Sequence, residues 1–440
     1  MFGKIIIFLL MISASISGIT SLFAEPLTIN DAVRLTLKTH PDVKIASALI
    51  EEAKGNRMSE LSLSSPGLAI EYEGIPDGEG FSEYEERRIA ISQEFEFPLR
   101  YIWLSRSANI EVELARLESR SLLLDLEARI RQTYFDTWIQ IRSNEILTEI
   151  SLGAESYAQK IERQFELGEA SRLDAKRARL EALEVKGQLK NAIRSVATAK
   201  LKLASLTGYD VSDVELVFSL DDNQIDTDRI GRALLDLKST SNQVIKEPIA
   251  DNPETAFIQA ELELAGTAKT LSRTAWLPEL EFSYFQQTVP DDDSEFWGVE
   301  LGFNLPVWFW WGGRGDMKVA EAHEKNIKEQ LAANQIDVLS EWQEIAQNLV
   351  SAVERYDLYK HDILPLSQET YELSIRSFDV GEADYFEVID AQRNLLDVQL
   401  DFLETTGDVY SNQIEIDRLE GRSILDYENK GNEGDIRRKP

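Results

Sequence analysis

The sequence contains no cysteine and few other residues that bind soft metal ions. The lack of cysteine excludes structural disulfides, thiolate metal sites and a lipidated cysteine at a processed N-terminus. The three histidines are far apart and show no ligand spacing: they are His40, His323 and His361. Methionine is scarce too, and only Met58 and Met317 lie outside the N-terminal signal-like segment. We therefore expect no metal site and no cofactor.

Basic residues are also scarce, with 46 Lys and Arg against 78 Asp and Glu and a formal net charge of −32. Because a nucleic-acid partner requires a basic surface, we expect none. The common catalytic motifs are missing too: there is no GxSxG, HExxH or phosphate-binding glycine loop. The stretch Gly312-Gly313-Arg314-Gly315 lacks the lysine of a P-loop. We expect no catalytic residues and no enzyme.

Long apolar runs are absent beyond the N-terminus. The run Ile5–Ile12 follows Lys4 and precedes small residues, which is the pattern of a secretory signal peptide. It is too short for a spanning helix, which needs about 20 apolar residues. We expect export, with the segment 1–24 removed by cleavage after Ala24 and not kept as a membrane anchor.

An internal repeat is the strongest pattern that the sequence does contain. Pro41 recurs as Pro253, an offset of 253 − 41 = 212, and three further residues recur at the same offset: Ala53 as Ala265, Pro66 as Pro278 and Tyr72 as Tyr284. The segment 165–170 recurs at 378–383 with an offset of 213. A near-constant offset over about 170 residues indicates two copies of one structural unit. The expected divisions are repeat 1 over 25–208, a linker over 209–250, repeat 2 over 251–421 and a disordered charged tail over 422–440.

Each repeat contains two short segments in which apolar and polar residues alternate. They are 68–73 and 89–97 in a first hairpin (68–97), then 280–284 and 297–305 in a second hairpin (280–305). One face of each carries Leu, Ile, Val, Phe, Trp or Tyr, and the other carries mainly Glu, Ser, Gly, Ala or Asn. This pattern is typical of barrel strands with lipid outside and water inside. The alternative is a soluble hairpin packed on a core, but the apolar faces have no other obvious partner in the sequence.

Two groups of residues in and beside the strands have expected roles in such a barrel. We expect an acidic lumen that could concentrate cations, lined by Glu71, Glu73, Glu94, Glu96, Glu281 and Glu300. Tryptophans favour the membrane–water boundary, and those we expect there are Trp297, Trp308, Trp310 and Trp311.

The rest of each repeat predicts very long helices, over 101–167, 170–207, 312–380 and 384–420. The first would be about 100 Å long. Apolar residues recur at steps of three or four, as in coiled coils, for example at Leu126, Ile130 and Tyr134. Gly168 and Gly381 are expected to end helices and allow tight reversals. Pro365 interrupts the third helix where a new helical turn can begin.

These features predict a mixed α and β fold with an internal two-fold repeat. It consists of a long α-helical coiled-coil barrel and a four-stranded contribution to a transmembrane β-barrel. Four strands cannot close a barrel, and their free edges would be costly in lipid. The chain must therefore assemble with others, and three copies would supply 3 × 4 = 12 strands. The strand pattern alone does not select three.

Two segments resemble the outer-membrane efflux protein family, the TolC-like channels. One runs from Ile363-Leu364-Pro365 through Tyr371 to Phe378–Arg393, and the other is Leu27–Val33 with Ala48–Gly55 after it. The resemblance extends over 27–421 and is nearest to members that serve heavy-metal cation pumps. It implies a homotrimer with a 12-stranded barrel in outer-membrane lipid and a helical tunnel across the periplasm. A periplasmic adaptor protein and an inner-membrane pump are the implied partners.

The resemblance also implies a gate. Glu387 and Asp390 match the acidic pair of the family's pore constriction, and Asp174 is the corresponding acid of repeat 1. Rings of such acids favour cations. Phe378 and Ala383 stand where some members have a tyrosine and an arginine that tie the closed state, which leaves open what holds this gate shut. Adaptor docking is expected at the turns, on Gly168, Glu169, Ala170, Gly381, Glu382, Ala383 and Asp384.

The expected function is therefore the exit duct of a tripartite efflux pump or a type I secretion system, with a lean towards heavy-metal cations. The main alternative is a periplasmic adaptor, which would have one hairpin of helices and no lipid-facing strands. A second alternative is a structural coiled-coil surface protein. The cargo and the cognate pump are left open.

Overall fold

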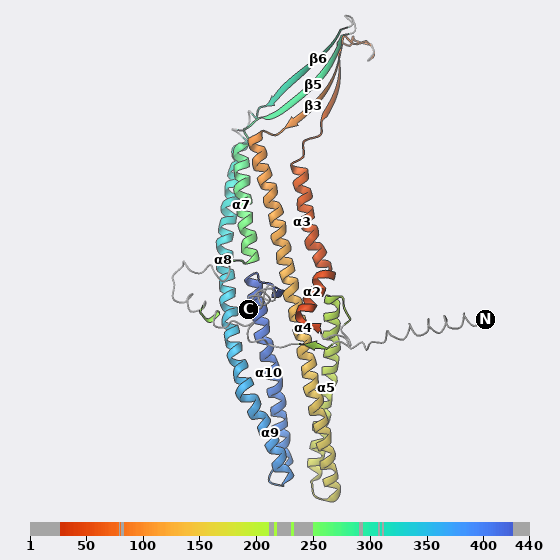
Figure 1. Ribbon diagram of the computed structural model, residues 1–440, viewed down its shortest axis with the longest axis vertical. Helices are drawn as coiled ribbons and strands as arrows, with labels where there is room; N and C mark the ends of the chain where they lie inside the picture. Colours follow the sequence, from red (N-terminus) through yellow and green to blue (C-terminus); the bar gives the residue numbers. More distant parts are fainter. Residues whose placement is uncertain are drawn as a thin grey trace, which may run out of the picture.

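The computed structural model describes residues 27–78, 80, 83–210, 215–217, 230–232, 250–289, 294–306, 309 and 312–425. Figure 1 shows an elongated molecule, with a sheet at one end and long helices that run to two tight turns at the other. The expected signal peptide, Trp308, Trp310, Trp311, residues 426–440 and most of the linker lie outside the described residues. Within the described part, none of the helices has both the length and the apolar composition that crossing a membrane requires.

The two halves of the chain share an order of one helix, two strands and two long helical segments. The first half forms β1 (Leu27–Thr28), α2 (Ile29–Thr39), α3 (Pro41–Glu60), β2 (Gly67–Glu73), β3 (Glu86–Phe95), α4 (Pro98–Leu167) and α5 (Arg172–Thr207). The second forms α7 (Pro253–Thr274), β5 (Glu279–Val289), β6 (Ser294–Asn304), α8 (Gly313–Leu358), a π-helical turn (Tyr359–Ile363), α9 (Leu364–Asp379) and α10 (Tyr385–Leu419). Between them, β4 (Leu216–Val217) pairs with β1 in parallel. The predicted mixed fold with long helices and a four-stranded sheet is confirmed.

The helices begin and end where local chemistry allows. The helix expected from residue 101 begins at Pro98, because proline suits the first helical turn. The helix expected over 312–380 is divided, since Pro365 has no backbone N–H to donate. The chain forms a π-helical turn over Tyr359–Ile363 and starts α9 at Leu364. With 70 residues, α4 is about 105 Å long.

The sheet is antiparallel, with strand order β2-β3-β5-β6. Its register aligns the apolar residues of all strands on one face: Leu68 pairs with Ile91, Ile91 with Tyr284, and Tyr284 with Val299. These side chains are exposed, as is Trp297 on the same face, which is 72% exposed. An exposed apolar face of this extent marks a surface that contacts lipid or another protein.

The opposite face of the sheet carries the expected acids, of which Glu300 and Glu96 form ion pairs. Glu94 pairs in register with Glu281, and Glu71 with Arg88. The Arg88 guanidinium lies 2.5 Å from the Glu300 carboxylate and 4.0 Å from the centre of the Phe285 ring. Glu96 follows β3 and forms an ion pair with Arg100 at 3.0 Å. This face therefore carries basic and aromatic side chains as well as the acidic and small ones that the alternation predicts.

The long helices pack along the seams that their apolar spacing predicts. In α4, Leu126, Ile130 and Tyr134 are fully buried, and in α8 Trp342 and Leu349 are fully buried. Helix α4 contacts α5 on one side and α10 on the other, and α10 also contacts α8 and α9. Each such side chain contributes about 1.5–3 kcal/mol of hydrophobic stabilisation.

A buried network of charged side chains joins the two halves of the chain near the middle of the long helix α4. Arg131 of α4 donates to Asp417 of α10 at 2.8 Å, and its guanidinium lies 3.8 Å from Glu127. Glu127 accepts hydrogen bonds of 2.6 Å from the Ser423 hydroxyl and the Ile424 backbone N–H. Ile424 is 2% exposed. The expectation of a disordered tail from residue 422 is therefore wrong for residues 422–425, which this network and the core hold in place.

Candidate functional site

The first tight turn, between α4 and α5, is held by a glycine and by a capping box. Gly168 has φ +80°, which is easily adopted only without a side chain, and the Glu169 N–H donates to Gln164 O at 2.8 Å. Ser171 then caps α5, with its hydroxyl accepting from the Asp174 N–H at 3.1 Å. The Asp174 carboxylate turns back to accept from the Ser171 hydroxyl at 2.5 Å and its N–H at 3.3 Å. This predicted gate residue is therefore engaged in capping its own helix.

The second turn, between α9 and α10, repeats this geometry with one difference. Gly381 also has φ +80°, and the Glu382 N–H donates to Ser377 O at 2.9 Å. Asp384 caps α10 by accepting from the Glu387 N–H at 3.0 Å. No hydrogen bond returns from the Asp384 backbone to the Glu387 carboxylate among the described contacts, and the Glu387 side chain is exposed. Asp390 is also exposed, one turn further along the helix.

Small and aromatic side chains fill the space between the two turns. Ala154, Ala158, Ala175, Ala178 and Ala182 belong to one buried cluster. These alanines lie on α4 and α5 and let the two helices approach closely. Against them pack the rings of Tyr157, Phe378 and Tyr385, with centroids 6.3–6.5 Å apart. Burial raises the pKa of Tyr157 to about 12, so its hydroxyl stays neutral at ordinary pH.

Two ion pairs connect the α4–α5 hairpin to the α9–α10 hairpin near these turns. Lys160 of α4 lies 2.8 Å from the Asp379 carboxylate, and its ammonium is 4.9 Å from the centre of the Phe378 ring. Arg393 of α10 forms a two-pronged hydrogen bond to Glu181 of α5, with Nε 2.9 Å from Oε1. Glu181 is largely buried, and its hydrogen bond is the main reason that the pKa of Arg393 is raised. Neither pair was predicted from the sequence.

The structure brings the expected docking residues of the two repeats to a common end of the molecule. A cleft of about 260 Å³ between the turns is lined by Glu169, Ala170, Asp174 and Asp384, together with Arg177 and Phe386. Glu387 and Asp390 lie on the first two turns of α10, next to this cleft. The expected sites at Gly168–Ala170 and Gly381–Asp384 are thus neighbours in space.

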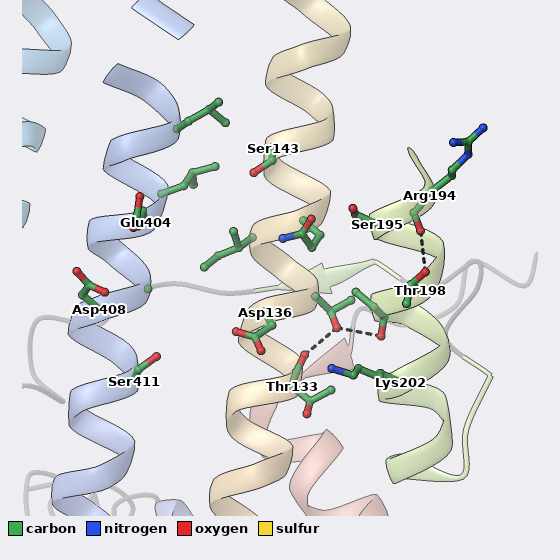
Figure 2. Close-up of a pocket in the computed structure, with 17 residues that line it drawn as sticks. Thr133, Asp136, Ser143, Arg194, Ser195, Thr198, Lys202, Glu404, Asp408 and Ser411 are labelled. Atoms are coloured by element: carbon green, nitrogen blue, oxygen red, sulfur yellow. Dashed lines mark hydrogen bonds between the residues drawn. The ribbon is translucent and has the colours of Figure 1, made fainter. Parts of the chain in front are cut away.

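A larger groove of about 770 Å³ lies further along the helices, between α5 and α10 with α4 as its floor. Figure 2 shows Asp136 on the α4 floor, Glu404 and Asp408 on the α10 wall, and Lys202 on the α5 wall. The Arg194 side chain points away from the groove (Figure 2). The Thr137 hydroxyl donates within α4 and across to the Ala199 carbonyl at 3.3 Å, which ties α4 to α5. Most of the residues that line the groove are polar, and the groove is open to solvent.

Neither this groove nor the cleft presents a constellation for metal binding. Across the residues that the structure describes, no three His, Cys, Asp or Glu side chains are grouped so that they could hold a metal ion. The acids of the turns are spread along a helix surface, an arrangement that creates a field without coordinating an ion.

Comparison with known proteins connects this architecture to a family. A family model described as outer membrane efflux protein matches residues 32–209 and 244–422, which correspond to the two repeats. The cobalt-zinc-cadmium resistance protein CzcC of Cupriavidus metallidurans is 21% identical over 405 residues, covering 91% of each chain.

Solved structures share the fold at low sequence identity. The CmeC outer membrane channel of Campylobacter jejuni aligns with a TM-score of 0.71 and 18% identity over 89% of this chain and 85% of CmeC. The outer membrane protein VceC of Vibrio cholerae gives 0.72 and 15%, over 90% and 96%. CusC, whose structures concern transmembrane channel formation, gives 0.73 and 14%, over 90% and 92%. None of these similarities supports the alternative of a periplasmic adaptor.

Proposed function

The chain belongs to the outer membrane efflux protein family, and we propose that three copies of it form one exit duct across the periplasm and the outer membrane. The observation that carries this proposal is the sheet, which has one exposed apolar face, one polar face and β2 and β6 at its edges. Strands with unpaired backbone groups are costly in lipid, and closing the sheet with two further copies satisfies them. The helices then extend from the barrel as a tube of about 100 Å.

The narrow end of this duct is the helical end, where Glu387 and Asp390 form its gate. Both carboxylates are exposed, and no described basic side chain forms an ion pair with either of them. Repeated in three copies, they place six negative charges in a constriction, which favours cations over anions. Asp174 has a weaker claim, because its carboxylate is occupied by the capping box.

The gate is held by the two ion pairs that connect the hairpins. Lys160–Asp379 and Arg393–Glu181 each join a helix of repeat 1 to one of repeat 2. They take the place of the tyrosine and arginine ties that Phe378 and Ala383 cannot make. Separating the hairpins requires both pairs to break. An adaptor protein that binds the turns at Gly168–Ala170 and Gly381–Asp384 is positioned to drive this, together with an inner-membrane pump.

The cargo is a divalent metal cation, as in the resistance system after which CzcC is named. Glu71, Glu73, Glu94 and Glu281 line the polar face of the sheet without an ion pair to another described residue. Such a wall concentrates cations without binding them tightly. The lack of a coordinating cluster among the described residues agrees with passage of hydrated ions.

Single-channel recording in planar bilayers tests the gate. We expect Glu387→Gln/Asp390→Asn to lower the cation-over-anion permeability ratio several-fold, because the charge rings are removed while the helix is kept. The matched control is Glu162→Gln/Glu166→Gln, which removes two exposed carboxylates from α4 near the same end. Equal ratios in the wild type and the gate variant would exclude the assignment. A purified protein that forms no channel would exclude the duct itself.

A further inference from the structure

Two helical segments of this chain carry opposite net charge over equal lengths. The 36 residues of α5 contain nine Lys and Arg and three Asp and Glu, a net charge of 9 − 3 = +6. An equally long stretch of the α8–α9 segment, 344–379, contains seven acids and three bases, a net charge of 3 − 7 = −4. In a chain that is strongly acidic overall, the basic helix is an exception that indicates an acidic partner.

Four basic residues of α5 face away from the rest of the subunit, whereas Arg179 pairs with Glu155 of α4. Glu181 marks the side of α5 that meets α10, because it bonds to Arg393. Arg172 and Lys190 are each about two and a half helical turns from Glu181 along the helix, and they therefore lie on the opposite side. Both are exposed, as are Lys186 and Arg194. None of these four forms an ion pair with a described residue.

The acidic residues of the α8–α9 segment are exposed in the same manner. They alternate along one helix face with exposed leucines, in the order Glu354, Leu358, Asp362, Leu366, Glu369 and Leu373. Helix α5 has a corresponding apolar set on the side of Lys190, at Leu183, Ile193 and Leu201, which are 51–70% exposed. Exposed apolar residues repeated along one helix face are typical of a seam whose partner is another chain.

The two surfaces lie on opposite flanks of the helical end. Helix α10 contacts α9 and α4, and α4 contacts α5, so the order across the subunit is α9, α10, α4, α5. Figure 1 shows α9 and α5 at the two sides of this end. In a closed ring of identical subunits, each flank meets the opposite flank of the next copy.

The charges also match in height above the turns. At ~1.5 Å per residue, Arg194 lies about 33 Å along α5 from its start, and Asp357 lies about 33 Å from the end of α9. By the same measure, Lys190 lies about 27 Å from the start of α5 and Asp362 about 26 Å from the end of α9. Because the two turns lie at a common end of the molecule, opposite charges meet at the same level when two copies stand side by side.

We infer that the α5 flank of one copy packs along the α8–α9 flank of the next, in a charge-matched seam that sets the order of subunits in the ring. This inference rests on the proposed trimeric duct and names the surfaces through which it closes. The leucines bury apolar surface in the seam. Pairing of two identical flanks is disfavoured because like charges would repel each other. Because the charged residues are exposed in the free subunit, the seam forms during assembly without changing the fold of each copy.

Chemical cross-linking tests the contact directly, and only introduced thiols can react because the chain has no native cysteine. We expect Lys190→Cys/Asp362→Cys, treated with a short bismaleimide, to give covalent dimers and trimers. The control Lys190→Cys/Glu404→Cys places the second thiol on the groove wall of α10, away from the seam, and should give no oligomer ladder. A purified trimer in which Lys190→Cys/Asp362→Cys does not cross-link would overturn the seam and leave the duct intact. A protein that neither assembles nor conducts would overturn both the seam and the duct.

Charge reversal tests the electrostatic basis. We expect Lys190→Glu/Arg194→Glu to reduce the yield of trimer on refolding about tenfold, since two attractive contacts become repulsive. Adding Asp357→Lys/Asp362→Lys should restore it. The control Arg177→Glu/Lys202→Glu makes the same charge change on α5, but at residues that line the cleft and the groove. Arg194 also borders the groove, but its side chain points away from it (Figure 2). Equal trimer yields for all variants, or loss in the control alone, would overturn the electrostatic seam.

Discussion

Removing the buried Arg131 should destabilise the rod more than removing any surface charge. Its side chain and that of Asp417 are 4% and 2% exposed, with the ion pair at 2.8 Å. Burial alone would favour a neutral guanidine, but Tyr410 and Asp417 hold the pKa of Arg131 above its ordinary value. The pair therefore stays charged and joins α4 of repeat 1 to α10 of repeat 2.

Arg131→Leu leaves the Asp417 carboxylate buried without this cation, although Gln413 still donates to it at 2.8 Å, and it removes the cation near Glu127. Stranding a buried carboxylate in this way costs about 3–5 kcal/mol. The measurement is urea unfolding of the purified protein in detergent, followed by far-UV circular dichroism. Arg116→Leu, which removes an exposed ion pair with Glu113, should cost less than about 1 kcal/mol.

A double-mutant cycle separates the loss of the pair from the loss of packing. In Arg131→Leu/Asp417→Leu neither charge is stranded, so the double variant should lose at least about 2 kcal/mol less than the sum of the single variants. Additive losses, or a single variant that loses less than about 1 kcal/mol, would refute the argument that the pair is held by mutual compensation.

Three further outcomes are expected. Burial raises the pKa of Glu127, so the folded state holds the carboxyl proton more tightly than the unfolded chain does. The resulting stabilisation is present below the unfolded pKa and is lost as pH rises through the folded pKa. Glu127→Gln should therefore reduce the dependence of the free energy of unfolding on pH, as measured by unfolding across pH. Gly168→Ala should destabilise the fold by about 1 kcal/mol because of the positive φ. Gly187→Ala, in open space within α5, should stabilise it by about 0.5–1 kcal/mol. A higher melting temperature for Gly168→Ala than for Gly187→Ala would contradict both. An added Cβ at Gly298 would collide with the Phe285 ring, so Gly298→Ala should lower the yield of folded sheet and Phe285→Leu should partly restore it, as judged by heat-modifiable migration in gels.

The two turns show how much of the site can be predicted from local sequence. Gly168 and Gly381 occur in matching segments, and both adopt φ +80° as the repeat predicts. The different behaviour of Asp174 and Glu387 was not accessible, because Ser171 before Asp174 and Asp384 before Glu387 both have the spacing of a capping box. Only the structure shows that Asp174 bonds back to its own helix end, while Glu387 is left exposed.

The ion pairs between hairpins were not accessible in this way. Lys160 and Asp379 are 219 residues apart, and Arg393 and Glu181 are 212 apart. Each residue lies on a helix with many other charges, so the spacing on one helix does not identify the partner on another. The burial of Ile424 was not predicted either, because the charged residues that follow residue 425 favoured a disordered tail. In the structure, Ile424 is buried and its backbone N–H bonds to Glu127 of α4.

The sequence by itself determined the repeat, the two-faced strands, the long helices and the glycine turns, because each depends on residues close together in the chain. The tertiary structure alone decided which helices lie side by side. That choice sets which charges are paired, as for Arg131 and Asp417, and which stay exposed, as for Glu387 and Lys190. Partners that are distant in sequence are brought together by the packing of whole helices, and the spacing of residues along one helix does not predict that packing.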